Sequence, residues 1–242
     1  SGTGAAAQYR VAGWMAAAHQ AFPFEFVLMM GDNLYGRERP ADYERKFARA
    51  YQPLLDAGVD FYASLGNHDE TSQRYFEPFN MNGERYYVFE PRDGVRVFAI
   101  DSNYLSPEQL EWLDRELAED AQWKIAFFHH PIYSSGGRHG SNVPMRQVLE
   151  PLFVKHGVDV VFQGHDHFYE RIEPQQGIHY FVSGAAAKLR RGDIDETGIH
   201  AEGFDDGYHF MLVEIAGPEL HFQVISDLGQ TVDQGVIRQG DS

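Results

Sequence analysis

The stretch that decides the fold is Phe-Val-Leu-Met-Met-Gly-Asp-Asn-Leu-Tyr, residues 26–35. Its first five residues are all apolar, which is typical of a buried strand, and Gly31 marks the end of that strand. An aspartate and a tyrosine follow directly. In an α/β sheet, ligands bind in the crevice outside the carboxyl ends of the strands. We therefore expect Asp32 and Tyr35 to lie in a functional crevice.

The same arrangement occurs three more times along the chain. Apolar runs lead to Gly-Asn-His-Asp at 66–69, to His-His-Pro at 129–131 and to Gly-His-Asp-His at 164–167. The oxygen and imidazole nitrogen atoms of these side chains are good ligands for first-row metal ions. Four strands that each end in such side chains indicate one shared site. We interpret this site as a centre for two metal ions.

Two-metal hydrolysis of a phosphoester needs a carboxylate shared by two cations that lie about 3.5–4 Å apart. A zinc-type ion lowers the pKa of bound water from about 15.7 to about 7, so hydroxide becomes available near neutral pH. The chain offers six side chains suited to holding two such ions: Asp32, Tyr35, Asn67, His129, His165 and His167.

The composition excludes several classes of partner. The chain has 242 residues and a net charge of −16, which disfavours binding to nucleic-acid backbones and to anionic membranes. A small anionic substrate then needs a local cationic site, which bound metal ions provide. There is no apolar run long enough for a transmembrane helix, and the lack of cysteines excludes disulfides and thiolate metal sites.

Helical and strand patterns alternate as far as His167, and strand patterns dominate after it. Helices are predicted at 4–20, from Pro40, from Pro107 after a Ser106 cap, and at 143–156. Strands are predicted at 26–30, 60–65, 86–89, 94–101, 123–128 and 158–163, and antiparallel strands at 178–183, 208–215, 219–225 and 231–237. The acidic segment 193–206 is predicted to be a solvated loop. No linker or repeat is visible, so we expect one domain over residues 1–242.

In this order, Gly-Asp-x-x-Tyr, Gly-Asn-His-Asp, His-x-Pro and Gly-His-Asp-His resemble the calcineurin-like metallophosphoesterase superfamily. The tyrosine three residues after the aspartate resembles the purple (tartrate-resistant-type) acid phosphatase branch. So do the run Gly-His-Asp-His-Phe-Tyr-Glu-Arg and the later Ser-Gly-Ala at 183–185. The resemblance covers essentially the whole chain. It implies an α/β fold, a four-layer α/β/β/α sandwich of two mixed β-sheets flanked by helices.

The resemblance also implies roles for individual residues. Asp32 bridges the two metal ions, and the other ligands divide into a ferric set, Tyr35 and His167, and a set for divalent iron, zinc or manganese: Asn67, His129 and His165. The family keeps outer-sphere histidines that contact phosphate and protonate the leaving group at positions matching His68 and His139.

Neighbouring polar residues receive supporting roles. We expect His130 to pack or to form a hydrogen bond, and we expect the carboxylates of Asp69, Asp101 and Asp166 to support the ligands. The family opens with a strand that ends in Gly-Asp-x-Gly, and its aspartate is a further ferric ligand. The start of this chain, Ser-Gly-Thr-Gly at 1–4, resembles the end of that motif. We therefore expect this strand and its aspartate to lie ahead of Ser1.

The expected activity is hydrolysis of small phosphomonoesters at a dinuclear metal centre, with metal-bound hydroxide as the nucleophile. Two alternatives stay open: a phosphodiesterase or nucleotidase that uses the same metal site, and an inactive homologue that binds phosphate or metal. The resemblance implies a secreted or periplasmic location. The sequence does not indicate an oligomeric state.

Overall fold

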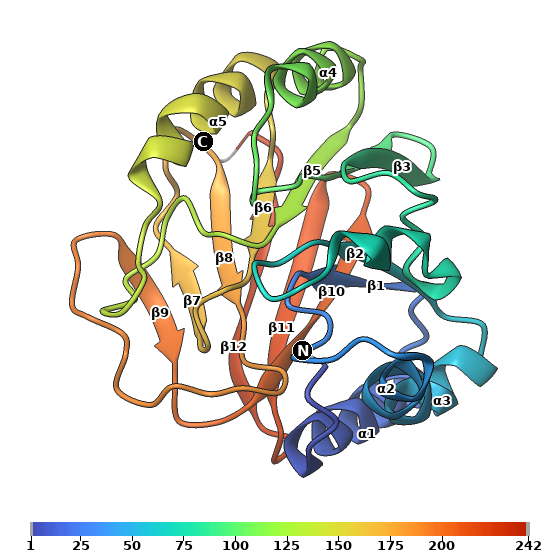
Figure 1. Cartoon of the computed structure of the whole chain (residues 1–242). Coiled ribbons are helices and arrows are strands. Elements are labelled where there is room, and N and C mark those ends of the chain that lie inside the picture. The colour runs from blue at the N-terminus through green and yellow to red at the C-terminus, as the bar shows by residue number, and fades with distance from the viewer. Residues whose placement is uncertain (1, 241–242) are drawn as a thin grey trace.

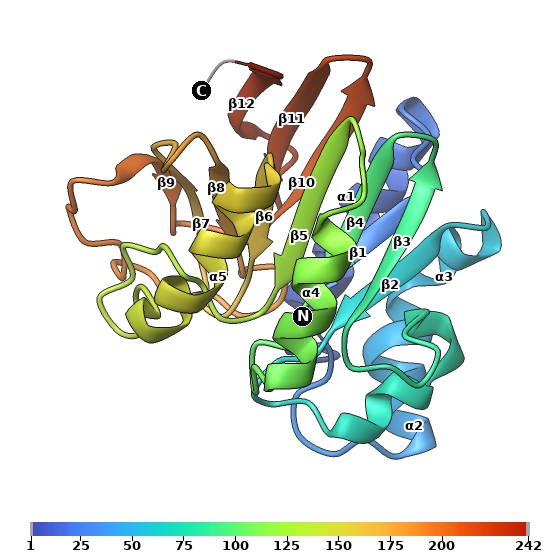
Figure 2. The same ribbon diagram turned by 90° about the horizontal axis from the view of Figure 1, so that it is seen from above.

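Two layers of strands lie face to face in the computed structural model, which describes residues 2–240, and helices cover both outer faces (Figures 1 and 2). The first layer is a seven-stranded sheet in the order β3-β4-β5-β6-β8-β7-β9. Its strands are β3 (Tyr87–Arg92), β4 (Val95–Ala99), β5 (Trp123–Phe128), β6 (Val160–Gln163), β7 (Tyr169–Ile172), β8 (His179–Ser183) and β9 (His200–Phe204). The central strands β4, β5, β6 and β8 are parallel, and the outer pairings are antiparallel.

The second layer consists of two separate pieces. In one, β1 (Phe26–Met30) pairs in parallel with β2 (Asp60–Ser64). In the other, β10 (His209–Ala216), β11 (Glu219–Ser226) and β12 (Thr231–Arg238) form an antiparallel meander. Within residues 2–240, β1 pairs with β2 alone and β10 pairs with β11 alone. Each piece therefore keeps an open edge toward the other, on β1 in the first piece and on β10 in the second.

Helices on the two outer faces complete the four layers. The elements are α1 (Ala6–Ala21), α2 (Pro40–Tyr43), a π-helical turn (Glu44–Ala48), α3 (Arg49–Asp56), two 3₁₀ turns (Thr71–Tyr75 and Glu77–Phe79), α4 (Pro107–Leu117) and α5 (Val143–His156). Val11 of α1 and Leu54 of α3 share a buried cluster with Phe61 of β2. On the opposite face, Leu113 of α4 and Leu149 of α5 are buried in one cluster with several side chains of the seven-stranded sheet. The α/β/β/α sandwich implied by the resemblance is confirmed.

A third cluster fills the space between the two strand layers. Val97, Ile125 and Phe181 from the seven-stranded sheet are buried in it, together with Phe222 and Val224 of β11. Because both faces of the central strands are covered, every residue of β4, β5 and β6 is buried. This burial explains why these strands are nearly continuous apolar runs in the sequence.

The helix boundaries agree with the capping signals. The Ser106 side chain accepts a hydrogen bond from the Gln109 N–H at 3.2 Å, and Pro107 occupies the first turn of α4. The Asn142 side chain accepts from the Met145 N–H at 3.1 Å at the start of α5. Gly157, with φ +65°, ends that helix in a left-handed conformation.

Several predictions of secondary structure are wrong. The acidic segment 193–206 contains β9, an edge strand whose partly exposed side chains hide the alternation expected of a strand. Strand β7 was not predicted. Strand β8 pairs antiparallel with β7, as the sequence favoured, but its pairing with β6 is parallel and was not expected. No helix within residues 2–240 is long and apolar enough to cross a membrane.

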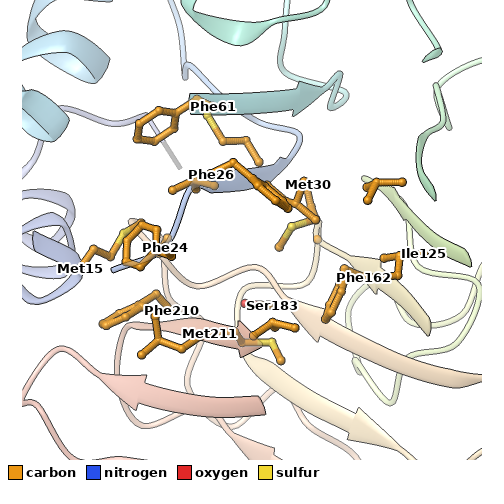
Figure 3. A pocket seen from close by; sticks show the side chains of 18 of the residues that line it. Met15, Phe24, Phe26, Met30, Phe61, Ile125, Phe162, Ser183, Phe210 and Met211 are labelled. Carbon is orange, nitrogen blue, oxygen red and sulfur yellow. The ribbon is translucent and has the colours of Figure 1, made fainter. Parts of the chain in front are cut away.

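A cavity of about 350 Å³ lies between the open edges of β1 and β10 (Figure 3). Apolar side chains line most of it, including Phe24, Met30, Phe162, Phe210 and Met211. At one end the cavity reaches the loop that follows β1, and with it the polar residues singled out in the sequence. This cavity divides the second layer in two.

Candidate metal centre

Four loops bring the predicted side chains together. They follow β1, β2, β5 and β6, so they lie at the carboxyl ends of strands from both layers. The first two loops pack backbone against backbone: a Cβ atom on Gly66 would collide with the Asp32 backbone, and one on Gly31 would meet the Gly66 backbone. Gly31 also has φ +76°, a conformation that glycine adopts without strain. These two glycines thus allow the close approach of the loops.

Asp69 fastens the same two loops to each other. Its carboxylate accepts hydrogen bonds from the backbone N–H groups of Gly66 at 2.8 Å, Asn33 at 3.0 Å and Leu34 at 3.1 Å. Burial raises the pKa of Asp69 to about 6, although these donors act in the opposite direction. These contacts support the role expected for Asp69 in positioning its neighbours, which remains a prediction.

Asp32 lies at the centre of the site. One carboxylate oxygen, Oδ2, accepts a hydrogen bond from the Tyr35 hydroxyl at 2.6 Å, while Oδ1 accepts from the His68 N–H at 3.1 Å. Oδ1 is also 3.3 Å from Nε2 of His129. Burial acts to raise the pKa of Asp32, but His129 and these two donors outweigh it, and the pKa lies below its usual value. Asp32 is therefore ionised, and its carboxylate has Tyr35 on the Oδ2 side and His129 on the Oδ1 side.

The first group of side chains is built around His129. Its Nδ1 is 2.8 Å from the Met30 carbonyl oxygen, which can only accept, so the ring proton belongs on Nδ1. Nε2 then presents a lone pair, 3.0 Å from Oδ1 of Asn67 and 3.0 Å from Nδ1 of His165. Burial lowers the pKa of His129 to about 4, so this lone pair is not protonated at neutral pH. The convergence of acceptor atoms fits a bound cation.

The second group lies on the other side of Asp32. The Tyr35 hydroxyl is 3.2 Å from Nε2 of His167 while it also bonds to Asp32. Burial lowers the pKa of His167 to about 4, whereas burial and the Asp32 carboxylate raise the pKa of Tyr35. A phenol, an imidazole and a carboxylate therefore meet at one point. Oxygen and imidazole nitrogen atoms that converge in this way are donors suited to a metal ion.

Two further histidines lie beside His165. The His139 ring centroid is 4.2 Å from that of His165, and the His130 ring centroid is 4.7 Å from it. His130 forms the hydrogen bond expected of it, since its Nδ1 is 3.0 Å from the Ser102 hydroxyl. Ligand atoms of His129, His130 and His165 nevertheless all lie within 4.8 Å of one another. His130 is thus closer to the centre than a purely supporting role requires.

The two residues predicted to act on substrate lie at the mouth of the site. His68 and His139 are both exposed. The His68 ring lies 5.2 Å from the Tyr35 ring, on the side of the second group, whereas His139 contacts His165 of the first. Among the supporting carboxylates, Asp166 accepts a hydrogen bond from Ser134 at 2.6 Å, and Asp101 pairs with Arg85.

Sequence reasoning missed two cations at the site. The Lys188 ammonium nitrogen is 3.3 Å from the centroid of the Tyr35 ring. The backbone N–H of Arg190 donates to the His167 carbonyl at 3.0 Å, which holds this residue beside the second group. The signal was available: both cations follow the Ser-Gly-Ala motif at 183–185 closely, in a chain that is otherwise strongly acidic.

Comparison with known proteins gives consistent results. A family model described as calcineurin-like phosphoesterase matches residues 7–169. Tartrate-resistant acid phosphatase type 5 of Oryctolagus cuniculus is 25% identical in an alignment 220 residues long, which covers 76% of this chain and 66% of that protein. Purple acid phosphatase 17 of Arabidopsis thaliana is 27% identical in an alignment 246 residues long, which covers 84% of this chain and 72% of that protein. This chain thus spans just under two thirds of the rabbit protein.

Solved structures share the fold at low identity. GAP50, the anchor in the inner membrane complex of Plasmodium, superposes with a TM-score of 0.81 at 18% identity, covering 97% of this chain and 84% of that one. The purple acid phosphatase PPD1 from yellow lupin seeds gives 0.71 at 18% identity, with 96% and 49% covered. The family match runs from α1 through the Gly-His-Asp-His loop, well over half of the chain and all four ligand loops. The chain therefore belongs to the calcineurin-like phosphoesterase family.

Proposed function

We propose that this protein hydrolyses phosphomonoesters at a dinuclear metal centre. The observation that carries the proposal is the position of Asp32, whose two oxygens face two separate groups of metal-binding atoms. Family membership and the acid phosphatase relatives support phosphoester hydrolysis in general. The preference for monoesters and the use of two metals are our inference.

The two groups would hold different ions. Tyr35 and His167 would bind a ferric ion, Asn67, His129 and His165 would bind divalent iron, zinc or manganese, and Asp32 would be shared. When bound, the ions supply positive charge for the phosphoryl oxygens and lower the pKa of water in the site. The Met30 carbonyl fixes the tautomer of His129, so that its Nε2 faces the divalent position.

Other residues of the chain would handle the proton and the leaving group. His68 and His139 are exposed at the mouth, where either imidazole can hold a proton for the departing oxygen. Partial desolvation, with the guanidinium groups of Arg190 and Arg138, lowers the pKa of His139. A lower pKa makes the protonated His139 imidazole a stronger acid, so it gives up its proton to the departing oxygen more readily.

Substitution of the shared ligand tests the proposal. Asp32→Ala should lose both metals and all turnover of p-nitrophenyl phosphate, because both groups lose their common ligand. Metal content is measured by elemental analysis, and the exposed Asp60→Ala serves as a control that keeps both metals and activity. Iron-loaded protein should show a visible tyrosinate–iron absorption band that Tyr35→Phe removes. Undiminished turnover in metal-depleted wild-type protein would contradict the proposal.

Two other functions use the same residues. A phosphodiesterase or nucleotidase would show a higher kcat/KM for diesters or nucleotides than for simple monoesters. A non-catalytic role is favoured by one observation, since the structure that superposes at a TM-score of 0.81 is described as an anchor. Metal-loaded protein that binds phosphate without turning over any ester would support this role.

Three expectations stay predictions. They are that residues 1–242 form one domain, that a further strand with its aspartate lies ahead of Ser1, and that the protein is secreted or periplasmic. The substrate is expected to be small and phosphorylated, as for other phosphoesterases.

A further inference from the structure

A loop that contributes nothing to the predicted ligand set forms one wall of the site. Residues 188–193, here called the cationic loop, carry Lys-Leu-Arg-Arg-Gly-Asp. Arg190 is tied through its backbone to His167, and the Asp193 carbonyl accepts a hydrogen bond from the Gly137 N–H at 2.7 Å. The cationic loop is thereby fastened both to the metal-ligand loop and to the loop that bears His139. The backbone of the cationic loop is therefore held beside the site.

Lys188 is held over the site in an unusual way. Its ammonium group lies 3.3 Å from the centroid of the Tyr35 ring, so its close neighbour is an aromatic face instead of a carboxylate. The side chain is only partly exposed. A partly desolvated ammonium in this position interacts strongly with any anion that enters.

Arg190 is oriented by a different contact. Its Nη1 donates to the carboxylate of Asp193 at 3.3 Å, and Asp193 has only 9% of its side chain exposed. The Asp193 N–H in turn donates to the Asp205 carboxylate at 3.1 Å. A guanidinium held on one side by a buried carboxylate keeps its remaining N–H groups for a second acceptor, and its planar shape suits phosphate oxygens.

Arg191, the next residue, differs from these two cations. It pairs with Asp206 at 3.1 Å, and the two side chains are 64% and 82% exposed. Lys188 and Arg190 are therefore distinguished from their neighbour by burial and by contact with the site. In a chain of net charge −16, this concentration of positive charge at the mouth needs an explanation beyond solubility.

We propose that Lys188 and Arg190 bind the terminal oxygens of the phosphoryl group and select phosphomonoesters over phosphodiesters. A monoester dianion has three terminal oxygens and two negative charges, whereas a diester has two such oxygens and one charge. Two metal ions and two side-chain cations therefore complement the charge and the three oxygens of the monoester better than those of the diester. This inference rests on the proposed function, since it assigns the substrate preference of the same site.

The test compares Lys188→Met and Arg190→Gln with Arg191→Met as the matched control. Calorimetry with inorganic phosphate on zinc-loaded protein should show binding weakened about tenfold or more in the first two variants, because each loses a charge-assisted hydrogen bond. Arg191→Met should bind as wild type does. Lys188→Arg, which keeps the charge, should restore most of the affinity.

The second measurement is the ratio of kcat/KM for p-nitrophenyl phosphate to that for bis(p-nitrophenyl) phosphate. The ratio should fall about tenfold in Lys188→Met and stay unchanged in Arg191→Met. If folded Lys188→Met and Arg191→Met bind phosphate with equal affinity, the inference is wrong. It is also wrong if Lys188→Met loses zinc, because Lys188 would then support the metal site through Tyr35 instead of binding phosphate. If wild type binds phosphate through Lys188 but hydrolyses no ester, the proposed function fails while the phosphate-binding role stands.

Discussion

The buried side chain of His209 makes the free energy of unfolding depend on pH. It is 1% exposed, its Nε2 lies 2.9 Å from the Ser183 hydroxyl, and burial lowers its pKa to about 3. In an unfolded chain the pKa of histidine is about 6.5. Between these two values the unfolded state binds more protons than the folded state. Stability therefore falls as the pH decreases from about 6.5 towards 3.

Replacing this side chain should reduce the pH dependence. In metal-free protein, the drop in unfolding free energy from pH 7 to pH 5 should be about 2 kcal/mol smaller in His209→Gln than in wild type. Urea denaturation at the two pH values measures the difference. An identical drop in wild type and His209→Gln would show that His209 is not buried in its neutral form.

The sequence predicted the side chains of the candidate site that follow strand ends, and it missed the two cations beside them. Asp32, His129 and His165 come together because each follows an apolar strand, and strand ends can be recognised locally. Lys188 and Arg190 follow no such strand end. Their position depends on hydrogen bonds to His167 and Gly137, which lie far away in sequence, and composition alone does not specify these contacts.

Among the secondary-structure elements, α5 depends on its cap. The Asn142 side chain satisfies one of the N–H groups that the first turn leaves unpaired. Asn142→Ala should lower the free energy of unfolding by about 1 kcal/mol, whereas Gln147→Ala, on the exposed face of the same helix, should change it little. Urea denaturation of both variants checks this prediction. Equal stability of the two would mean that the cap contributes nothing.

The fully buried central strands were easy to predict, and the edge strand β9 was not. Strands β4, β5 and β6 are buried throughout, so their apolar runs are unambiguous. Strand β9 is paired only with β7 and keeps polar side chains, and a solvated loop has the same composition. The π-helical turn between α2 and α3 contains neither glycine nor proline, so no helix-breaking residue marks it in the sequence.

At the scale of the whole molecule, the site exists because two layers end at the same place. Asp32 and Asn67 follow strands of the divided layer, whereas His129 and His165 follow strands of the seven-stranded sheet. The sequence predicted that these side chains meet in one site without showing how the two layers come together. The packing of Leu28 and Met30 against side chains of the larger sheet fixes that arrangement, and it depends on contacts between distant segments.

The open edges of β1 and β10 have a consequence for dynamics. Amide groups on these edges face the cavity instead of a neighbouring strand, whereas β5 and β6 are hydrogen-bonded on both sides. Hydrogen–deuterium exchange should therefore be rapid for alternate amides of β1 and β10 and slow throughout β5 and β6. Uniformly slow exchange in all four strands would contradict this expectation. Mild denaturant should separate the portion that contains β1 and β2 first. Within residues 2–240, no ladder of backbone hydrogen bonds joins these two strands to either of the other sheets.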